Sequence, residues 1–220
     1  MKFHIILSMG ILCLVPASRG SQEIYSEALA QFKSSQYEVA IQTVDRAEPE
    51  SPQKIPLLEL KGRILAALGK HEEALMEFQK VVALDDKRAS AHFHVGEVFF
   101  SQKKWPEAFG AFRYALDMDS QYRTPILKMI YCLIIMENYP AAHQWISTLD
   151  PTDDMSPDYY FGRAAMELAT GSMQEHNDLL RQARTIYSTE VFNRFEPDLL
   201  RVAKVLKERP GTAASAPASP

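Results

Sequence analysis

The feature that most constrains this 220-residue chain is a set of small and large apolar residues that recurs every 34 positions. Its reference alanines are Ala40, Ala74, Ala108 and Ala142. Twelve residues before each alanine stands Ala28, Gly62, Gly96 or Ile130, and four residues after each stands Val44, Phe78, Phe112 or Ile146. Two antiparallel helices approach closely where one offers a small side chain and the other fills the gap, and the larger side chains then bury against the next helix pair.

This spacing predicts four helix pairs, and turn and capping residues support their boundaries. Thr124 places a capping hydroxyl before Pro125 at a first helical position. Gly69 and Asn138 fall in the short turns within two of the pairs. The predicted helices span 22–34 and 38–48, 56–68 and 72–84, 90–102 and 106–118, and 124–136 and 140–149.

Residues 56–120 carry the clearest copies of the pattern, since Gly62, Ala74 and Phe78 superpose at an offset of 34 on their counterparts in the next copy. This arrangement resembles the tetratricopeptide repeat family, whose 34-residue unit is a helix–turn–helix with Ala-x-x-x-Phe in its second helix. The resemblance implies an all-α fold, a solenoid of antiparallel helix pairs with a capping helix at its C-terminal end.

The same frame gives a division of the whole chain. Repeats are expected at about 21–54, 55–88, 89–122 and 123–154, followed by a degenerate fifth hairpin at 155–190. The fifth hairpin departs from the pattern because His176 occupies the place 34 residues after Ala142. A capping segment is expected at 191–209, with its amphipathic helix beginning at about Pro197, and an Ala/Ser/Pro-rich disordered tail at 210–220.

Residues 1–20 have the layout of a secretory signal peptide. Lys2 precedes an apolar run from Phe3 to Val15, and small residues follow Pro16. The run is too short to span a bilayer comfortably, so the sequence predicts an exported protein without a stable membrane span in its mature form. In a bacterium this means the periplasm or the cell exterior. A buried N-terminal helix, or a segment retained as an anchor, is the alternative.

Charge and motifs favour no catalytic or nucleic-acid-binding class. The chain has 24 basic and 28 acidic residues in a mixed pattern, whereas nucleic acid calls for a basic patch. His92 and His94 are two residues apart, so they point away from each other on a helix and cannot share a metal ion. The chain also lacks a zinc-binding His-Glu-x-x-His motif and a glycine-rich phosphate loop. We therefore expect a protein that is not an enzyme and needs no cofactor or metal.

The resemblance implies that a protein or peptide partner binds the concave face, which the first helix of each repeat lines. The inner residues expected to form this groove are Phe93, Glu97, Phe100, Leu127, Tyr131 and Ile134, with Arg63 and Glu59 at its rim. An apolar, aromatic groove rimmed by charge suits a peptide or a partner helix. The alternative is that several of these residues pack against their neighbours or against the terminal helix.

Three functional readings are open from the sequence. The first is a non-catalytic scaffold that holds a peptide or partner helix. The second is a structural subunit of an envelope assembly that uses the same surface to form a homo-oligomer. The third is a protein resembling the secretion chaperones of the repeat family, which stay in the cytoplasm.

Overall fold

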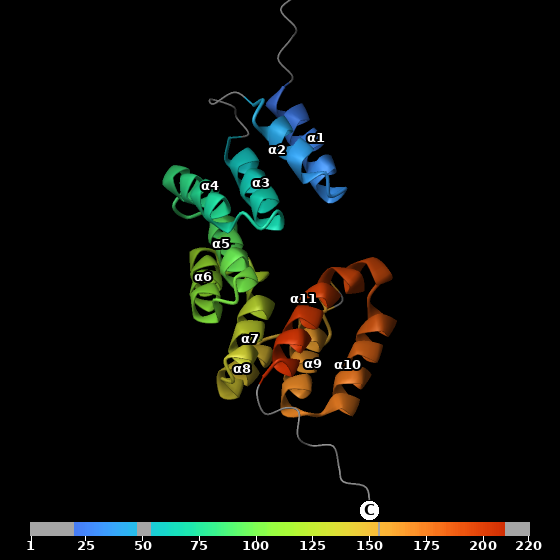
Figure 1. Ribbon diagram of the computed structural model, residues 1–220. Helices are drawn as coiled ribbons and strands as arrows, with labels where there is room; N and C mark the ends of the chain where they lie inside the picture. Colours follow the sequence, from blue (N-terminus) through green and yellow to red (C-terminus); the bar gives the residue numbers. More distant parts are fainter. Residues whose placement is uncertain (1–19, 48–53, 154, 210–220) are drawn as a thin grey trace, which may run out of the picture.

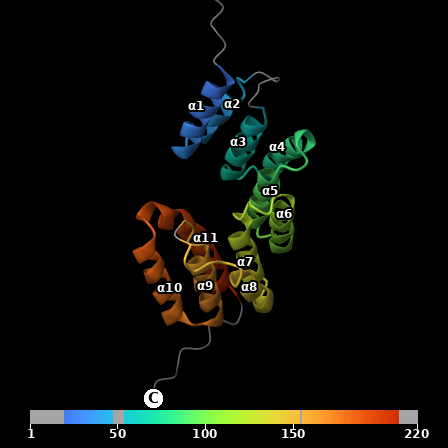
Figure 2. The ribbon, with the colours of Figure 1, turned by 180° about the vertical axis from the view of Figure 1, so that it is seen from behind.

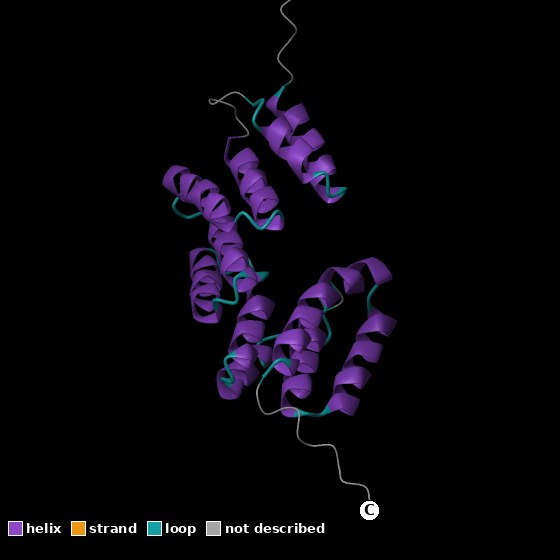
Figure 3. Ribbon diagram, viewed as in Figure 1, coloured by secondary structure: helices purple, strands orange, loops and turns teal. Residues whose placement is uncertain are grey.

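The computed structural model describes residues 20–47, 54–153 and 155–209, and its secondary structure there consists of helices without a strand (Figure 3). Of the predicted signal peptide only Gly20 is described, and the predicted C-terminal tail lies outside these ranges. None of the described helices has the length and apolar character needed to cross a membrane. The helices are α1 (Ser21–Lys33), α2 (Tyr37–Val44), α3 (Lys54–Ala67), α4 (His71–Leu84), α5 (Ala89–Ser101), α6 (Trp105–Met118), α7 (Pro125–Ile135), α8 (Tyr139–Ile146), α9 (Asp158–Thr170), α10 (Met173–Ile186) and α11 (Thr189–Lys207).

Helices α1 to α10 form successive antiparallel pairs that stack along a curved line (Figure 1). The second helix of each of the first four pairs also contacts the first helix of the next pair, for example α4 with α5 and α6 with α7. First helices contact one another along the inner side, as α1 does with α3 and α7 with α9. This confirms the predicted all-α solenoid of antiparallel helix pairs.

Small residues hold the paired helices together as the spacing predicts. A Cβ atom added at Gly62 would lie 2.6 Å from the ring of Phe78, and one added at Gly96 would lie 2.6 Å from the ring of Phe112. The alanine that precedes each of these phenylalanines by four residues is fully buried. The aromatic ring therefore fills the space that the glycine leaves open.

The turn inside each pair keeps the same frame through all five pairs. Each turn has one residue with a left-handed backbone, and these residues are 34 positions apart: Ser35, Gly69, Lys103, Glu137 and Gly171. The residue after each of them donates its N–H to the helix carbonyl five positions earlier, as Ser172 does to Glu167 at 2.8 Å. The fifth pair thus follows the repeat geometry, and the Nδ1 atom of His176 lies 2.8 Å from the Ala164 carbonyl oxygen.

Three helix boundaries differ from the prediction by more than two residues. Helices α2 and α8 end at Val44 and Ile146, before the expected 48 and 149. After each end the chain continues as a tighter turn, with backbone hydrogen bonds between residues three positions apart. Helix α11 begins at Thr189, so the expected start at Pro197 is wrong. The Ser188 hydroxyl accepts the N–H of Val191 at 3.3 Å and caps the helix, and Pro197 lies within it.

Helix α11 turns back along the inner side of the stack and packs against α7, α9 and α10 (Figures 1 and 2). Its buried side chains are Phe192, Leu199, Val202 and Leu206. Just beyond its end, the Arg209 guanidinium donates to the carbonyl oxygens of Ile134 and Ile135. These two carbonyls belong to the last turn of α7, so the end of α11 is fixed to the fourth pair.

Candidate functional site

Five of the predicted groove residues are almost entirely buried. Their exposed fractions are 6% for Phe93, 1% for Phe100, 5% for Leu127, and 0% for Tyr131 and Ile134. The prediction that they are exposed is wrong because α9 and α11 cover α7, while the two phenylalanines pack among other aromatic rings. The packing alternative that the sequence left open therefore describes these five residues.

The three charged residues of the predicted groove remain partly exposed. The Glu59 carboxylate accepts hydrogen bonds from Arg88, with its Oε2 atom 3.0 Å from Nη2, and from the Ser90 hydroxyl. Burial raises the pKa of Glu59, but these two partners outweigh it and the net shift is downward. The Arg63 guanidinium lies 5.1 Å from the centre of the Phe32 ring. Of these three residues, Glu59 and Arg63 lie in α3 and have partners of their own, whereas Glu97 lies in α5, two helices further along the chain.

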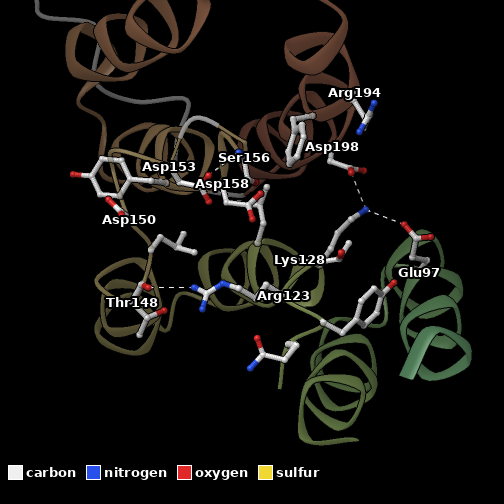
Figure 4. A pocket seen from close by; sticks show the side chains of 17 residues that line it. Glu97, Arg123, Lys128, Thr148, Asp150, Asp153, Ser156, Asp158, Arg194 and Asp198 are labelled. Atoms are coloured by element: carbon white, nitrogen blue, oxygen red, sulfur yellow. Dashed lines mark hydrogen bonds and ion pairs between the residues drawn. The ribbon is translucent and has the colours of Figure 1, made fainter. Parts of the chain in front are cut away.

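A pocket of about 720 Å³ opens on the inner side of the stack, between α7, α9 and α11 (Figure 4). This volume lies within the range of about 300–1,000 Å³ that ligand pockets commonly have. Of the predicted groove residues, Glu97 and Leu127 line it. The complete lining is Glu97, Gln121, Tyr122, Arg123, Thr124, Leu127, Lys128, Thr148, Leu149, Asp150, Asp153, Ser156, Asp158, Tyr159, Arg194, Phe195 and Asp198.

Lys128 occupies one wall of the pocket and joins three helices (Figure 4). Its Nζ atom lies 3.1 Å from Oε1 of Glu97 in α5 and 2.7 Å from Oδ2 of Asp198 in α11. The Lys128 side chain is only 12% exposed. Burial raises the pKa of Glu97, but Lys128 and His94 outweigh it and lower this pKa to about 2. Glu97 is therefore a carboxylate at neutral pH.

The opposite wall is acidic and consists of Asp150, Asp153 and Asp158. The Asp153 carboxylate accepts the N–H of Ser156 at 3.3 Å. Burial raises the pKa of Asp158 to about 6, and repulsion from Asp153 adds to this effect. A hydrogen bond with Ser156 and the positive charge of Arg123 act in the opposite direction but do not cancel it.

Sequence reasoning missed three residues that define this pocket, Lys128, Asp158 and Asp198. One signal was available, since Lys128 is the only charged residue in α7, and a charge inside an apolar helix indicates a shielded ion pair. Asp158 and Asp198 come from α9 and α11. The position of Asp198 beside α7 depends on how α11 returns across the inner face, which the repeat spacing does not predict.

Comparisons with known proteins agree with this architecture. Residues 59–123 match a family model described as tetratricopeptide repeat. No curated protein sequence matches the chain. Solved structures resemble it in fold, at sequence identities too low to indicate more than the fold.

Three bacterial structures illustrate the resemblance. A thermophilic repeat protein of Thermus thermophilus has a TM-score of 0.64 and 17% identity, covering 84% of this chain and 98% of its own. A tetratricopeptide repeat protein of Parabacteroides merdae has a TM-score of 0.59 and 16% identity, covering 84% and 76%. The pilF protein of Pseudomonas aeruginosa has a TM-score of 0.57 and 15% identity, covering 81% and 82%.

Proposed function

We propose that the chain is a non-catalytic scaffold that binds a partner protein on its concave face. Its fold and the family match of residues 59–123 both indicate a tetratricopeptide repeat protein. Proteins of this fold generally bind other proteins on the curved surface that stacked repeats create. The observation that carries the proposal is the pocket of about 720 Å³ on that face. Its lining combines apolar and aromatic side chains with charged ones, as protein interfaces combine an apolar centre with a polar rim.

The proposed binding site differs from the groove that the sequence suggested. Phe100, Tyr131 and Ile134 are core residues, so a partner reaches the concave face through the pocket and its rim. Glu97 belongs to that rim. Glu59 and Arg63 are partly exposed on the inner side of an earlier repeat, and we propose that they extend the contact area toward the N-terminal end of the stack.

Site-specific photo-crosslinking in the source organism tests this proposal. The photoreactive amino acid p-benzoylphenylalanine replaces Tyr159, which lines the pocket, or Tyr114, an exposed tyrosine of the outer helix α6. Both replacements exchange one aromatic side chain for another, so Tyr114 is a control of the same chemistry on the outer face. We expect a discrete crosslinked protein from position 159 that position 114 does not give.

The crosslinked protein, once identified and purified, must also bind the purified unmodified chain. Binding in solution together with a crosslink confined to position 159 supports the scaffold. Absence of any crosslink at position 159, or the same products from both positions, argues against a partner site on the concave face.

Self-association into a homo-oligomer is the second candidate function. Met173 and Ile186 of α10 are 51% and 49% exposed, although both are large and apolar. These two side chains lie near opposite ends of α10, in the last pair of the stack, where a second copy of the chain can contact them. Sedimentation velocity distinguishes this candidate, because a clean monomer at micromolar concentration contradicts it.

We propose export for the chain on the basis of residues 1–20, which have a short basic start and an apolar run. N-terminal sequencing of the protein purified from the source organism tests this. A mature N-terminus near residue 21 supports export. An intact Met1 on a cytoplasmic protein favours instead the reading of a secretion-chaperone-like protein.

A further inference from the structure

The side chains around the pocket carry more negative than positive charges. The lining contains five carboxylates, from Glu97, Asp150, Asp153, Asp158 and Asp198, and three cationic groups, from Arg123, Lys128 and Arg194. A cavity with this lining attracts positive charge, because its carboxylates outnumber its cations.

Each of the three cationic groups already has a partner within the protein. Lys128 pairs with both Glu97 and Asp198. The Arg123 guanidinium donates to the Thr148 carbonyl oxygen at 3.3 Å, and Arg194 lies 3.9 Å from Glu190 on its own helix. The remaining carboxylates, on Asp150, Asp153 and Asp158, have no cation at ion-pair distance within the described ranges of the chain. The negative charge is therefore concentrated on the wall formed by the start of α9 and the loop before it.

Apolar side chains complete the lining. Leu127, Leu149 and Phe195 line the pocket from three different segments, together with Tyr122 and Tyr159. A small cation alone leaves these groups in contact with water. A ligand that carries positive charge beside an apolar group satisfies both parts of the lining.

We propose that the pocket holds a short extended peptide segment of the partner protein, with a lysine or arginine side chain against Asp153 and Asp158 and an adjacent apolar side chain against Leu127 and Phe195. This inference rests on the proposed scaffold function and adds the chemistry of the partner. An acidic segment is disfavoured, because it meets a lining in which carboxylates already outnumber cations.

Binding of two peptide pools to the purified chain tests the proposal. One pool consists of fluorescein-labelled hexapeptides with lysine at two fixed positions and mixed leucine, valine, phenylalanine and alanine elsewhere. The second pool has glutamate in place of lysine. Fluorescence anisotropy at about 0.1 M salt, where long-range attraction between exposed charges is largely screened, measures the affinity.

Two double variants separate pocket binding from general attraction to an acidic protein. Asp153→Asn with Asp158→Asn removes charge from the pocket and keeps an oxygen acceptor at both positions. Glu72→Gln with Glu107→Gln removes the same charge from exposed positions of the outer helices α4 and α6. Circular dichroism and thermal unfolding establish that both variants are folded.

We expect the lysine pool to bind and the glutamate pool not to bind. The pocket variant should lose at least tenfold in affinity, and the outer-helix variant should keep the affinity of the original chain. Equal losses in both variants, equal binding of both pools, or no binding of the lysine pool would overturn the proposal. If position 159 still crosslinks to a protein in that case, the scaffold function stands and only the cationic segment is rejected.

Discussion

The Nζ atom of Lys128 in α7 lies 2.7 Å from Oδ2 of Asp198 in α11, so an ion pair joins the last helix of the chain to the inner face of the fourth helix pair. The same ammonium group lies 3.1 Å from Oε1 of Glu97 in α5. One lysine thus connects the first helices of two consecutive pairs to α11, a helix that the repeat pattern alone does not place beside them. The stability of this connection and the shape of the pocket depend on the same side chain.

Replacing Lys128 with methionine should destabilise the protein by about 1–3 kcal/mol, because it leaves the partly buried carboxylates of Glu97 and Asp198 without their cation. Urea unfolding followed by circular dichroism measures the change. Lys70→Met is the control, since its pair with Glu73 has both side chains 52% exposed and is worth less than about 1 kcal/mol. Equal effects of the two substitutions would show that the Lys128 pairs contribute little.

The Tyr131→Phe substitution should leave the free energy of unfolding unchanged or raise it by up to about 1 kcal/mol. Its hydroxyl is fully buried and, within the described chain, has no hydrogen-bond partner, so the substitution removes an unsatisfied group. Tyr187→Phe should have the opposite effect, a loss of about 1 kcal/mol, because that hydroxyl donates to the carbonyls of Asp153 and Ser156. Urea denaturation of both variants compares them directly, and a large loss in Tyr131→Phe would contradict this account.

The sequence predicts the solenoid because its packing rule is local. Gly62 and Phe78 are 16 residues apart and meet within a single helix pair, so their recurrence every 34 residues reports the contact itself. The burial of Tyr131 depends instead on α11, whose amphipathic pattern shows that one face must be covered but does not show by which helix. The first eight residues of α11 were also missed, because a proline is usually interpreted as the start of a helix and Pro197 lies inside this one.

Two glycines should respond in opposite ways to the same substitution. Gly96→Ala should destabilise the protein by about 1–3 kcal/mol, because the new methyl group would lie 2.6 Å from the buried ring of Phe112. Gly110→Ala should stabilise it by roughly 0.5–1 kcal/mol, since no side chain or neighbouring segment lies within 4 Å of the added Cβ and alanine favours a helix. Thermal unfolding provides the measurement. The Phe112→Leu substitution, which shortens the opposing ring, should recover part of the loss in Gly96→Ala, and a purely additive double variant would contradict close packing at this site.

Asp158 should make stability fall as the pH rises from about 4 to above 6. Burial raises its pKa in the folded chain from 3.8 to about 6, so between these values the folded protein keeps a proton that the unfolded chain releases. The stabilisation is complete below about pH 4 and is lost as the pH rises through about 6, with an upper limit of roughly 3 kcal/mol for a shift of about two pKa units. Asp158→Asn removes this titration while keeping an oxygen beside Ser156, so at neutral pH it should be more stable than the original chain.

The control is Asp117→Asn, at an exposed residue of α6, and the measurement is urea unfolding across this pH range. Identical pH profiles for the original chain and Asp158→Asn would show that the Asp158 carboxyl group is not held in a desolvated position at the pocket wall.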